Sequence, residues 1–166
     1  SARLEIKAGK ADMPVFEGLD DLYATIRWRG YYGGIRIIQA MIIRFVDYCR
    51  QNNIEIEERN FTLEYESTVP LRLGMGGSSA IITAALRALC KFYGVELHPA
   101  IQAKLVLEAE THELGVPAGP QDRVIQSYEG AVYMDFRRDL MESRGYGEYE
   151  RLDPALDALL APDAHL

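Results

Sequence analysis

Apolar side chains recur at helical spacing along two long stretches of the chain. Within residues 34–51 they return every three or four positions, and Asn52-Asn53 follows as a stop signal. Residues 78–93 repeat the same period, and Gly94 stands where a helix C-cap is expected. The pattern therefore predicts two amphipathic helices, each with one face turned toward a core. The apolar stripe of the first helix consists of Ile35, Ile38, Ile42, Phe45, Val46 and Cys49.

A shorter stretch alternates with a period of two. Phe61, Leu63 and Tyr65 alternate with polar residues within 60–68, which predicts a half-buried strand. The mixture of helices and strands lacks a regular βαβ alternation, so it favours an α+β fold in which a small sheet packs with helices. The other expected elements are strands at 3–7 and 131–136, helices at 20–27, 98–114 and 121–128, and a polar, peripheral tail after residue 137.

Composition narrows the class of protein. A chain of 166 residues fits one domain, and an apolar fraction of 48% is enough for a substantial core. A net charge of −7 argues against a nucleic-acid surface, and no apolar run is long enough for a membrane span. Cys49 and Cys90 both fall in helical patterns and are expected to be free thiols, which together with the absence of a signal-peptide pattern favours the cytoplasm.

The segment 70–80 carries the clearest chemical signal. It contains three glycines within four residues and then two serines, at the point where a strand pattern gives way to a helix. Glycine lets backbone N–H groups approach an anion, a helix N-terminus attracts phosphate, and a serine hydroxyl can ligate Mg²⁺. The candidate phosphate-binding residues are Gly74, Met75, Gly76, Gly77, Ser78 and Ser79.

Two common phosphate loops do not match this segment. A Walker A loop needs a lysine before its serine, and a dinucleotide fingerprint needs a glycine where Ser79 stands. The simplest alternative is that a glycine-rich turn followed by serine is only a helix N-cap.

Two segments together resemble the GHMP superfamily of small-molecule kinases (galactokinase, homoserine kinase, mevalonate kinase and phosphomevalonate kinase). Residues 70–80 are similar to its second motif, Pro-x-x-x-Gly-Leu-Gly-(small)-Ser-(Ser/Ala)-Ala, with Met75 in place of leucine. Residues 110–122 resemble the segment that carries a metal-binding glutamate and a catalytic aspartate. The resemblance implies that Ser78 and Glu110 hold Mg²⁺, that Asp122 is the general base and that ATP is the phosphate donor.

Within the superfamily, residues 30–36, 60–63 and 118–136 resemble the glucuronokinase branch. That branch converts ATP and D-glucuronate to ADP and glucuronate 1-phosphate, so a sugar acid is the expected substrate. Other acceptors remain open, among them a heptose phosphate, galactose and fucose. A second alternative is a non-catalytic domain on the same ribosomal-protein-like α+β scaffold. The oligomeric state is left open.

The superfamily's other motifs are not seen. Its first motif is not visible before residue 30, and its third, glycine-rich motif is absent. Residues 1–166 are therefore expected to be part of the N-terminal, ATP-binding domain, without the C-terminal domain.

Each candidate residue also has a purely structural interpretation. Glu110 could be a solvated helix position, Asp122 could cap the helix after Pro120, and Ser79 could satisfy helix N–H groups, which is the interpretation we favour for Ser79. Tyr31 and Tyr32 are expected to be packing residues. Arg36 and Arg123 are open between pairing with a substrate carboxylate and a surface role.

Overall fold

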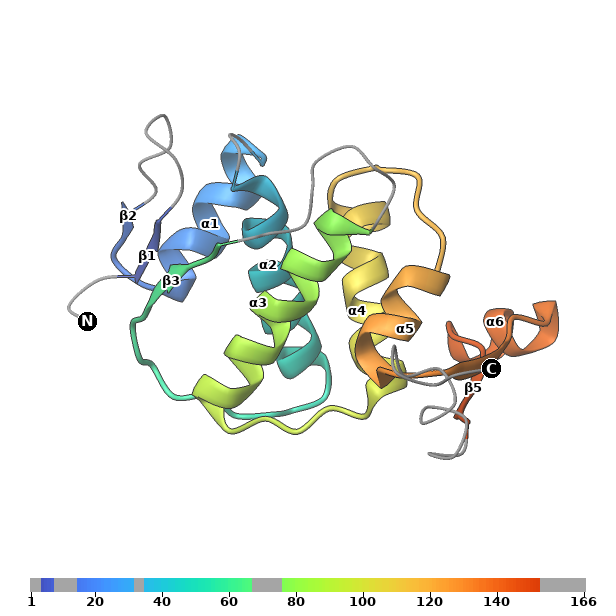
Figure 1. Ribbon diagram of the computed structural model, residues 1–166. Coiled ribbons are helices and arrows are strands. Elements are labelled where there is room, and N and C mark those ends of the chain that lie inside the picture. Colours follow the sequence, from blue (N-terminus) through green and yellow to red (C-terminus); the bar gives the residue numbers. More distant parts are fainter. Residues whose placement is uncertain (1–3, 8–14, 32–34, 67–75, 153–166) are drawn as a thin grey trace.

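The computed structural model describes residues 4–7, 15–31, 35–66 and 76–152 (Figure 1). The described elements are β1 (Leu4–Lys7), β2 (Val15–Phe16), α1 (Leu19–Arg29), α2 (Arg36–Gln51), β3 (Thr62–Glu64), α3 (Gly77–Tyr93), α4 (Pro99–Glu108), the π-helical turn η1 (Ala109–Glu113), α5 (Gln121–Tyr128), β4 (Val132–Asp135), α6 (Arg138–Arg144) and β5 (Glu148–Arg151). Two candidate residues of the glycine loop, Gly74 and Met75, lie outside the described residues, as does Tyr32.

Two small sheets flank a group of helices. In the first sheet β1 lies between β2 and β3, antiparallel to β2 and parallel to β3. The second sheet is the antiparallel pair β4 and β5. The helices α2, α3 and α4 lie between the two sheets (Figure 1). The α+β class expected from the sequence is therefore confirmed.

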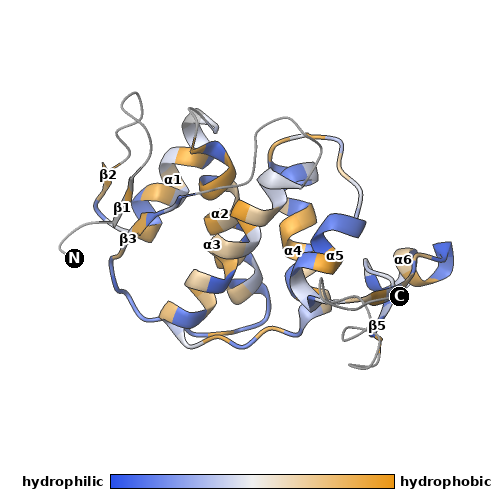
Figure 2. Ribbon diagram, in the orientation of Figure 1, coloured by the Kyte–Doolittle hydropathy of each residue, from blue (hydrophilic) through white to orange (hydrophobic). Residues whose placement is uncertain are grey.

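The core is built on the apolar faces of α2 and α3. Every residue of the predicted α2 stripe is buried, from Ile35 to Cys49. On α3 the buried side chains include Ile82, Ala85 and Leu89. Figure 2 shows apolar residues concentrated on these central helices, whereas α5 at the side is largely hydrophilic. Helical spacing alone thus identified which faces are removed from water.

The helix ends follow the expected signals. Gly94 adopts a left-handed conformation with φ of 69° and donates its N–H to the carbonyl of Cys90, which closes α3. Pro99 begins α4, and the side chain of His98 accepts a hydrogen bond from the N–H of Ala100. Both cysteines were expected to be buried free thiols. Both are free, but only Cys49 is buried while Cys90 is partly exposed, and burial raises the pKa of each to about 11.

The predicted strand at 60–68 is shorter than expected. Only Thr62–Glu64 forms a strand, and Tyr65 is exposed, while part of the predicted range lies outside the described residues. The parallel partner β1 offers only four residues, of which Glu5, Ile6 and Lys7 align with β3. Within the described residues, the ladder between β1 and β3 consists of these three aligned pairs.

The polar tail expected after residue 137 lies at the edge of the molecule, and its described part, up to residue 152, is folded (Figure 1). Residues 138–144 form α6, and β5 pairs with β4 so that Tyr149 lies opposite Met134. The ring of Tyr149 packs edge-on against Tyr128 at 5.8 Å and Phe136 at 5.6 Å between centroids. Tyr149, together with the buried Leu140, therefore attaches this segment to the rest of the fold. No helix among the described residues is long and apolar enough to cross a bilayer.

Candidate active site

The N-terminus of α3 lies directly after the glycine-rich segment. Gly76 precedes the helix in a left-handed conformation with φ of 63°, and within the described part of the chain no side chain caps the helix. The carbonyl of Gly76 accepts hydrogen bonds from the hydroxyl of Ser79 at 2.8 Å, from Nε2 of Gln126 at 3.1 Å and from the N–H of Ala80 at 2.9 Å. The first turn of α3 therefore presents uncapped backbone N–H groups, the usual feature of a phosphate-binding helix end.

Gly76 is also the point at which α5 approaches the loop. A Cβ atom on Gly76 would lie 2.9 Å from Nε2 of Gln126, 3.2 Å from Oδ2 of Asp122 and 3.2 Å from Oγ of Ser79. A larger residue would meet both the left-handed backbone penalty and these side chains. The same distances place the carboxylate of Asp122 beside the start of α3.

Glu110 reaches the site because α4 ends in a π-helical turn. The sequence predicted a continuous helix over 98–114, but residues 109–113 widen into η1. The carbonyl of Glu110 accepts the N–H of Val116 at 2.8 Å, and the hydroxyl of Thr111 bonds the carbonyl of Leu107 at 2.9 Å. Single π turns of this kind are frequent at functional sites because they redirect one side chain.

The side chain of Glu110 is buried against Ser78. Its residue exposure is 3%, so the alternative of a solvated helix position was wrong. The hydroxyl of Ser78, at the start of α3, donates to Oε1 of Glu110 at 2.9 Å. Two residues that are far apart in sequence therefore meet at the uncapped helix end.

Arg123 was misjudged from the sequence. It is buried, with 7% exposure, so a surface role is wrong. Its Nε donates to Oε2 of Glu110 at 2.8 Å, and Nη2 contacts the same oxygen. Its Nη1 donates to the carbonyl of Gly119 at 2.9 Å and lies 3.6 Å from Oδ2 of Asp122. All three guanidinium nitrogens thus contact protein acceptors, and no helical or strand period signalled this pairing.

Asp122 lies in the first turn of α5 but does not cap it. The helix has no side-chain cap hydrogen bond within the described residues, and 52% of the Asp122 side chain is exposed. The capping alternative was therefore wrong. Ser79 is fully buried and uses its hydroxyl as a donor to Gly76, which is a structural role, although its partner is a carbonyl instead of the expected N–H groups.

The oxygen donors at the end of α3 suit a magnesium ion that is shared with another molecule. Octahedral Mg²⁺ with bonds of 2.0–2.1 Å places adjacent ligand oxygens about 2.9 Å apart. Oγ of Ser78 and Oε1 of Glu110 have this separation, 2.9 Å. In the part of the chain that the structure describes, no group of three or more Asp, Glu, His or Cys residues could hold a metal by itself. Further ligands would come from phosphate and water oxygens.

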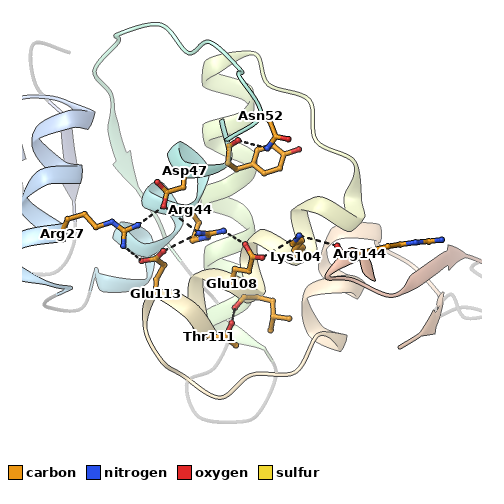
Figure 3. A network of polar contacts seen from close by, with 11 residues as sticks. Arg27, Arg44, Asp47, Asn52, Lys104, Glu108, Thr111, Glu113 and Arg144 are labelled. Atoms are coloured by element: carbon orange, nitrogen blue, oxygen red, sulfur yellow. Dashed lines mark hydrogen bonds and ion pairs between the residues drawn. The ribbon is translucent and has the colours of Figure 1, made fainter. Parts of the chain in front are cut away.

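On its other side, η1 is held by a network of ion pairs that links it to α1 and α2 (Figure 3). Arg44 contacts Glu108, and its Nη1 lies 3.7 Å from Glu113. Arg27 pairs with Asp47 at 2.8 Å and with Glu113 at 3.4 Å. These contacts fix the residue before η1 and the last residue of η1.

A separate cavity of about 530 Å³ lies between α1, the C-terminal end of α2 and residues 54–60. None of the candidate residues Ser78, Glu110 and Asp122 lines it. The candidate site at the start of α3 is therefore separate from this cavity.

The sequence of this chain is similar to those of known proteins. Residues 37–130 match the model of the GHMP kinases N terminal domain. The chain is 41% identical over 157 residues to Glucuronokinase 1 of Arabidopsis thaliana, covering 93% of this chain and 42% of that protein. It is 32% identical over 115 residues to a D-glycero-alpha-D-manno-heptose 7-phosphate kinase of Campylobacter jejuni, covering 69% of this chain and 32% of that protein.

Among solved structures, the Methanococcus jannaschii mevalonate kinase superposes with a TM-score of 0.71 over 98% of this chain and 46% of its own. At 18% sequence identity, this likeness concerns the fold alone. The chain spans less than half the length of these relatives.

Proposed function

Because this chain belongs to the GHMP kinases, whose N-terminal domain it matches, we propose that it forms the nucleotide-binding part of an ATP-dependent sugar kinase. One observation carries the proposal. The uncapped start of α3, the Ser78–Glu110 pair and the carboxylate of Asp122 all lie around Gly76. A non-catalytic domain on the same scaffold would have no reason to gather two carboxylates at a phosphate-binding helix end.

In the proposed reaction a sugar hydroxyl attacks the γ-phosphorus of ATP and the bond to the β–γ bridging oxygen breaks, releasing ADP. The N–H groups of residues 74–79 bind the phosphate oxygens at the start of α3. Ser78 and Glu110 hold Mg²⁺, which when bound neutralises charge on the phosphates. Asp122 accepts the proton of the attacking hydroxyl, and its half-exposed position leaves it reachable by a second substrate.

D-Glucuronate is the proposed acceptor and glucuronate 1-phosphate the proposed product. Support comes from the similarity to Glucuronokinase 1, which extends over 93% of this chain. A heptose phosphate is the second candidate, because the similarity to the Campylobacter jejuni kinase covers 69% of this chain. A cytoplasmic location, the absence of a nucleic-acid partner and the domain assignment of residues 1–166 stay predictions from the sequence.

A coupled ADP-release assay on the complete protein tests the proposal. D-glucuronate, D-galactose, L-fucose and D-glycero-D-manno-heptose 7-phosphate are compared at equal concentration with Mg²⁺ and ATP, and the product is identified by phosphorus NMR. We expect the highest kcat/KM for D-glucuronate and a product phosphorylated at C1. A higher kcat/KM for the heptose phosphate would identify it, and not D-glucuronate, as the acceptor. If none of the sugars caused ADP release, the proposed kinase function would be refuted.

A further inference from the structure

Arg123 and Ser78 bond different oxygens of the Glu110 carboxylate. Oε2 accepts hydrogen bonds from Nε of Arg123 at 2.8 Å and from Nη2. Among the described residues, Oε1 accepts its hydrogen bond from the hydroxyl of Ser78 at 2.9 Å. The arginine therefore decides which oxygen faces the start of α3, and it occupies the oxygen that a bidentate metal contact would also need.

Glu110 and Arg123 form a pair of opposite charges, and the half-exposed carboxylate of Asp122, 3.6 Å from Nη1 of Arg123, adds one negative charge beside that pair. Glu110 and Arg123 are 3% and 7% exposed. A buried carboxylate without a counter-charge attracts a cation strongly or takes up a proton, whereas guanidinium stays charged throughout the working pH range. Among the described residues, no cluster of three metal-ligating side chains accompanies Glu110.

We propose that Arg123 makes divalent-cation binding conditional on the nucleotide. Its guanidinium cancels the charge of Glu110, so that the cation binds only when a nucleoside triphosphate contributes its own phosphate oxygens. Arg123 is in this sense a positioning residue, acting through Glu110. The inference rests on the proposed role of Ser78 and Glu110 at the nucleotide site.

A purely structural tie between η1 and α5 has different consequences. In that case, loss of Arg123 weakens the fold and leaves the response to cations unchanged. If the guanidinium instead offsets the charge of Glu110, its removal creates a cation site where there was none. Removing one positive charge about 5 Å from a divalent ion corresponds to a gain in affinity of at least roughly tenfold even at the dielectric of water, and to more in a buried site.

The experiment is a titration of the complete protein with Mn²⁺, followed by electron paramagnetic resonance, without nucleotide and again with ATP. We expect the wild type to bind Mn²⁺ measurably only with ATP. Arg123→Gln should bind Mn²⁺ without nucleotide, with an affinity at least roughly tenfold above the upper limit that the titration sets for the wild type. Arg123→Lys keeps the charge and should behave as the wild type. Arg87→Gln is the matched control, because Arg87 bonds the carbonyl of Gln126 on α5 and is partly exposed.

The outcomes separate the two proposals. Wild type that fails to bind Mn²⁺ even with ATP would contradict the proposed function. Wild type that binds Mn²⁺ tightly without nucleotide, or Arg123→Gln that gains no affinity, would overturn this inference and leave the kinase proposal standing. If Arg123→Gln does not fold in buffer, recovery of folding on adding Mn²⁺, but not on adding NaCl of equal ionic strength, supports the inference, and folding that Mn²⁺ fails to restore overturns it.

Discussion

The two sides of η1 both use arginine to hold carboxylates, and the comparison separates a scaffold from a candidate site. Toward α2, Glu113 is shared by Arg27 and Arg44 and is also bonded by the hydroxyl of Tyr31. Toward α3, Glu110 has one arginine on one oxygen and a serine hydroxyl on the other. Both carboxylates are largely removed from water, so burial alone does not distinguish them.

The two sides differ in whether their carboxylate oxygens are still able to bind a ligand. On the α2 side the cations and anions bond one another, and they fix η1 at its two ends (Figure 3). On the α3 side, Oε1 of Glu110 accepts a hydrogen bond from the hydroxyl of Ser78 and from no other described residue, and Asp122 is half exposed. We infer that the first arrangement stabilises the turn and the second leaves ligands for a substrate complex.

The largest expected effect is on the α3 side, at Asp122. Asp122→Asn keeps the shape of the side chain but removes the proposed proton acceptor, so kcat in the coupled assay should fall by about 10²–10⁴-fold. ATP affinity, measured by calorimetry, should change little. The control is Asp20→Asn, a change at a largely exposed ion pair with Arg50, which should retain wild-type kcat. Full activity of Asp122→Asn would remove the base assignment.

A pair of neighbouring serines gives the next largest effect. Ser78→Ala removes a proposed metal ligand, and the Mg²⁺ concentration needed for half-maximal nucleotide binding should rise by at least the roughly 10–100-fold that loss of an outer-shell partner costs. Ser79→Ala removes the bond to the carbonyl of Gly76 and should lower the free energy of unfolding by about 1 kcal/mol.

Urea denaturation and Mg²⁺ titration of both serine variants provide the measurement. We expect only Ser78→Ala to change the Mg²⁺ requirement, because Ser78 is exposed and contacts Glu110. Ser79 is fully buried, so Ser79→Ala should change stability instead. If Ser79→Ala shifted the Mg²⁺ requirement as much as Ser78→Ala, the division between a ligand and a structural hydroxyl would be wrong.

A smaller effect is expected when the α2 side is disturbed. Arg44→Met leaves Glu108 and Glu113 with fewer partners, and because 16% of the arginine side chain is exposed, water can replace part of the loss. The free energy of unfolding should fall by about 1–3 kcal/mol, measured by urea denaturation. The Mg²⁺ requirement should stay within twofold of the wild type, an estimate of roughly 0.4 kcal/mol at most. A shift as large as that of Ser78→Ala would show that both sides of η1 serve the metal.

The sequence was sufficient for the parts of this arrangement that depend on local pattern. The apolar periods identified α2 and α3, and the predicted helix at 121–128 has the bounds of α5. The steric role of Gly76 follows from a left-handed turn beside a helix start, which the glycine run indicated. These features are encoded within one turn or one strand of chain.

The parts that were missed depend on contacts between distant segments. The π turn changes no residue type in the helical pattern, and it is stabilised by Arg44 from another helix. Arg123 lies in an ordinary polar position of α5 and becomes buried only because Glu110 lies opposite. The β4–β5 pair relies on Tyr149 within a polar stretch. The hydrophobic periodicity of one segment carries no information about such contacts with a distant segment.

The smallest expected effect concerns alkaline pH on the α2 side. Burial, and then the hydrogen bond to Glu113, raise the pKa of Tyr31 above its usual value. Because the unfolded phenol loses its proton near pH 10 while the folded one keeps it, this contribution to stability is full below about pH 10 and is lost as pH rises through the folded pKa.

The wild type should therefore lose stability above about pH 10 more steeply than Tyr31→Phe, by under about 1 kcal/mol, because the half-buried ring is partly screened by water. Urea denaturation at pH 8, 9, 10 and 10.5 measures the slope, and Tyr133→Phe, at an exposed strand position, is the control. Equal slopes for wild type and Tyr31→Phe would mean that Glu113 is held by the arginines alone. The α2 side would then be an ion-pair network to which the phenol adds nothing, and the contrast with the hydroxyl-held Glu110 would become sharper.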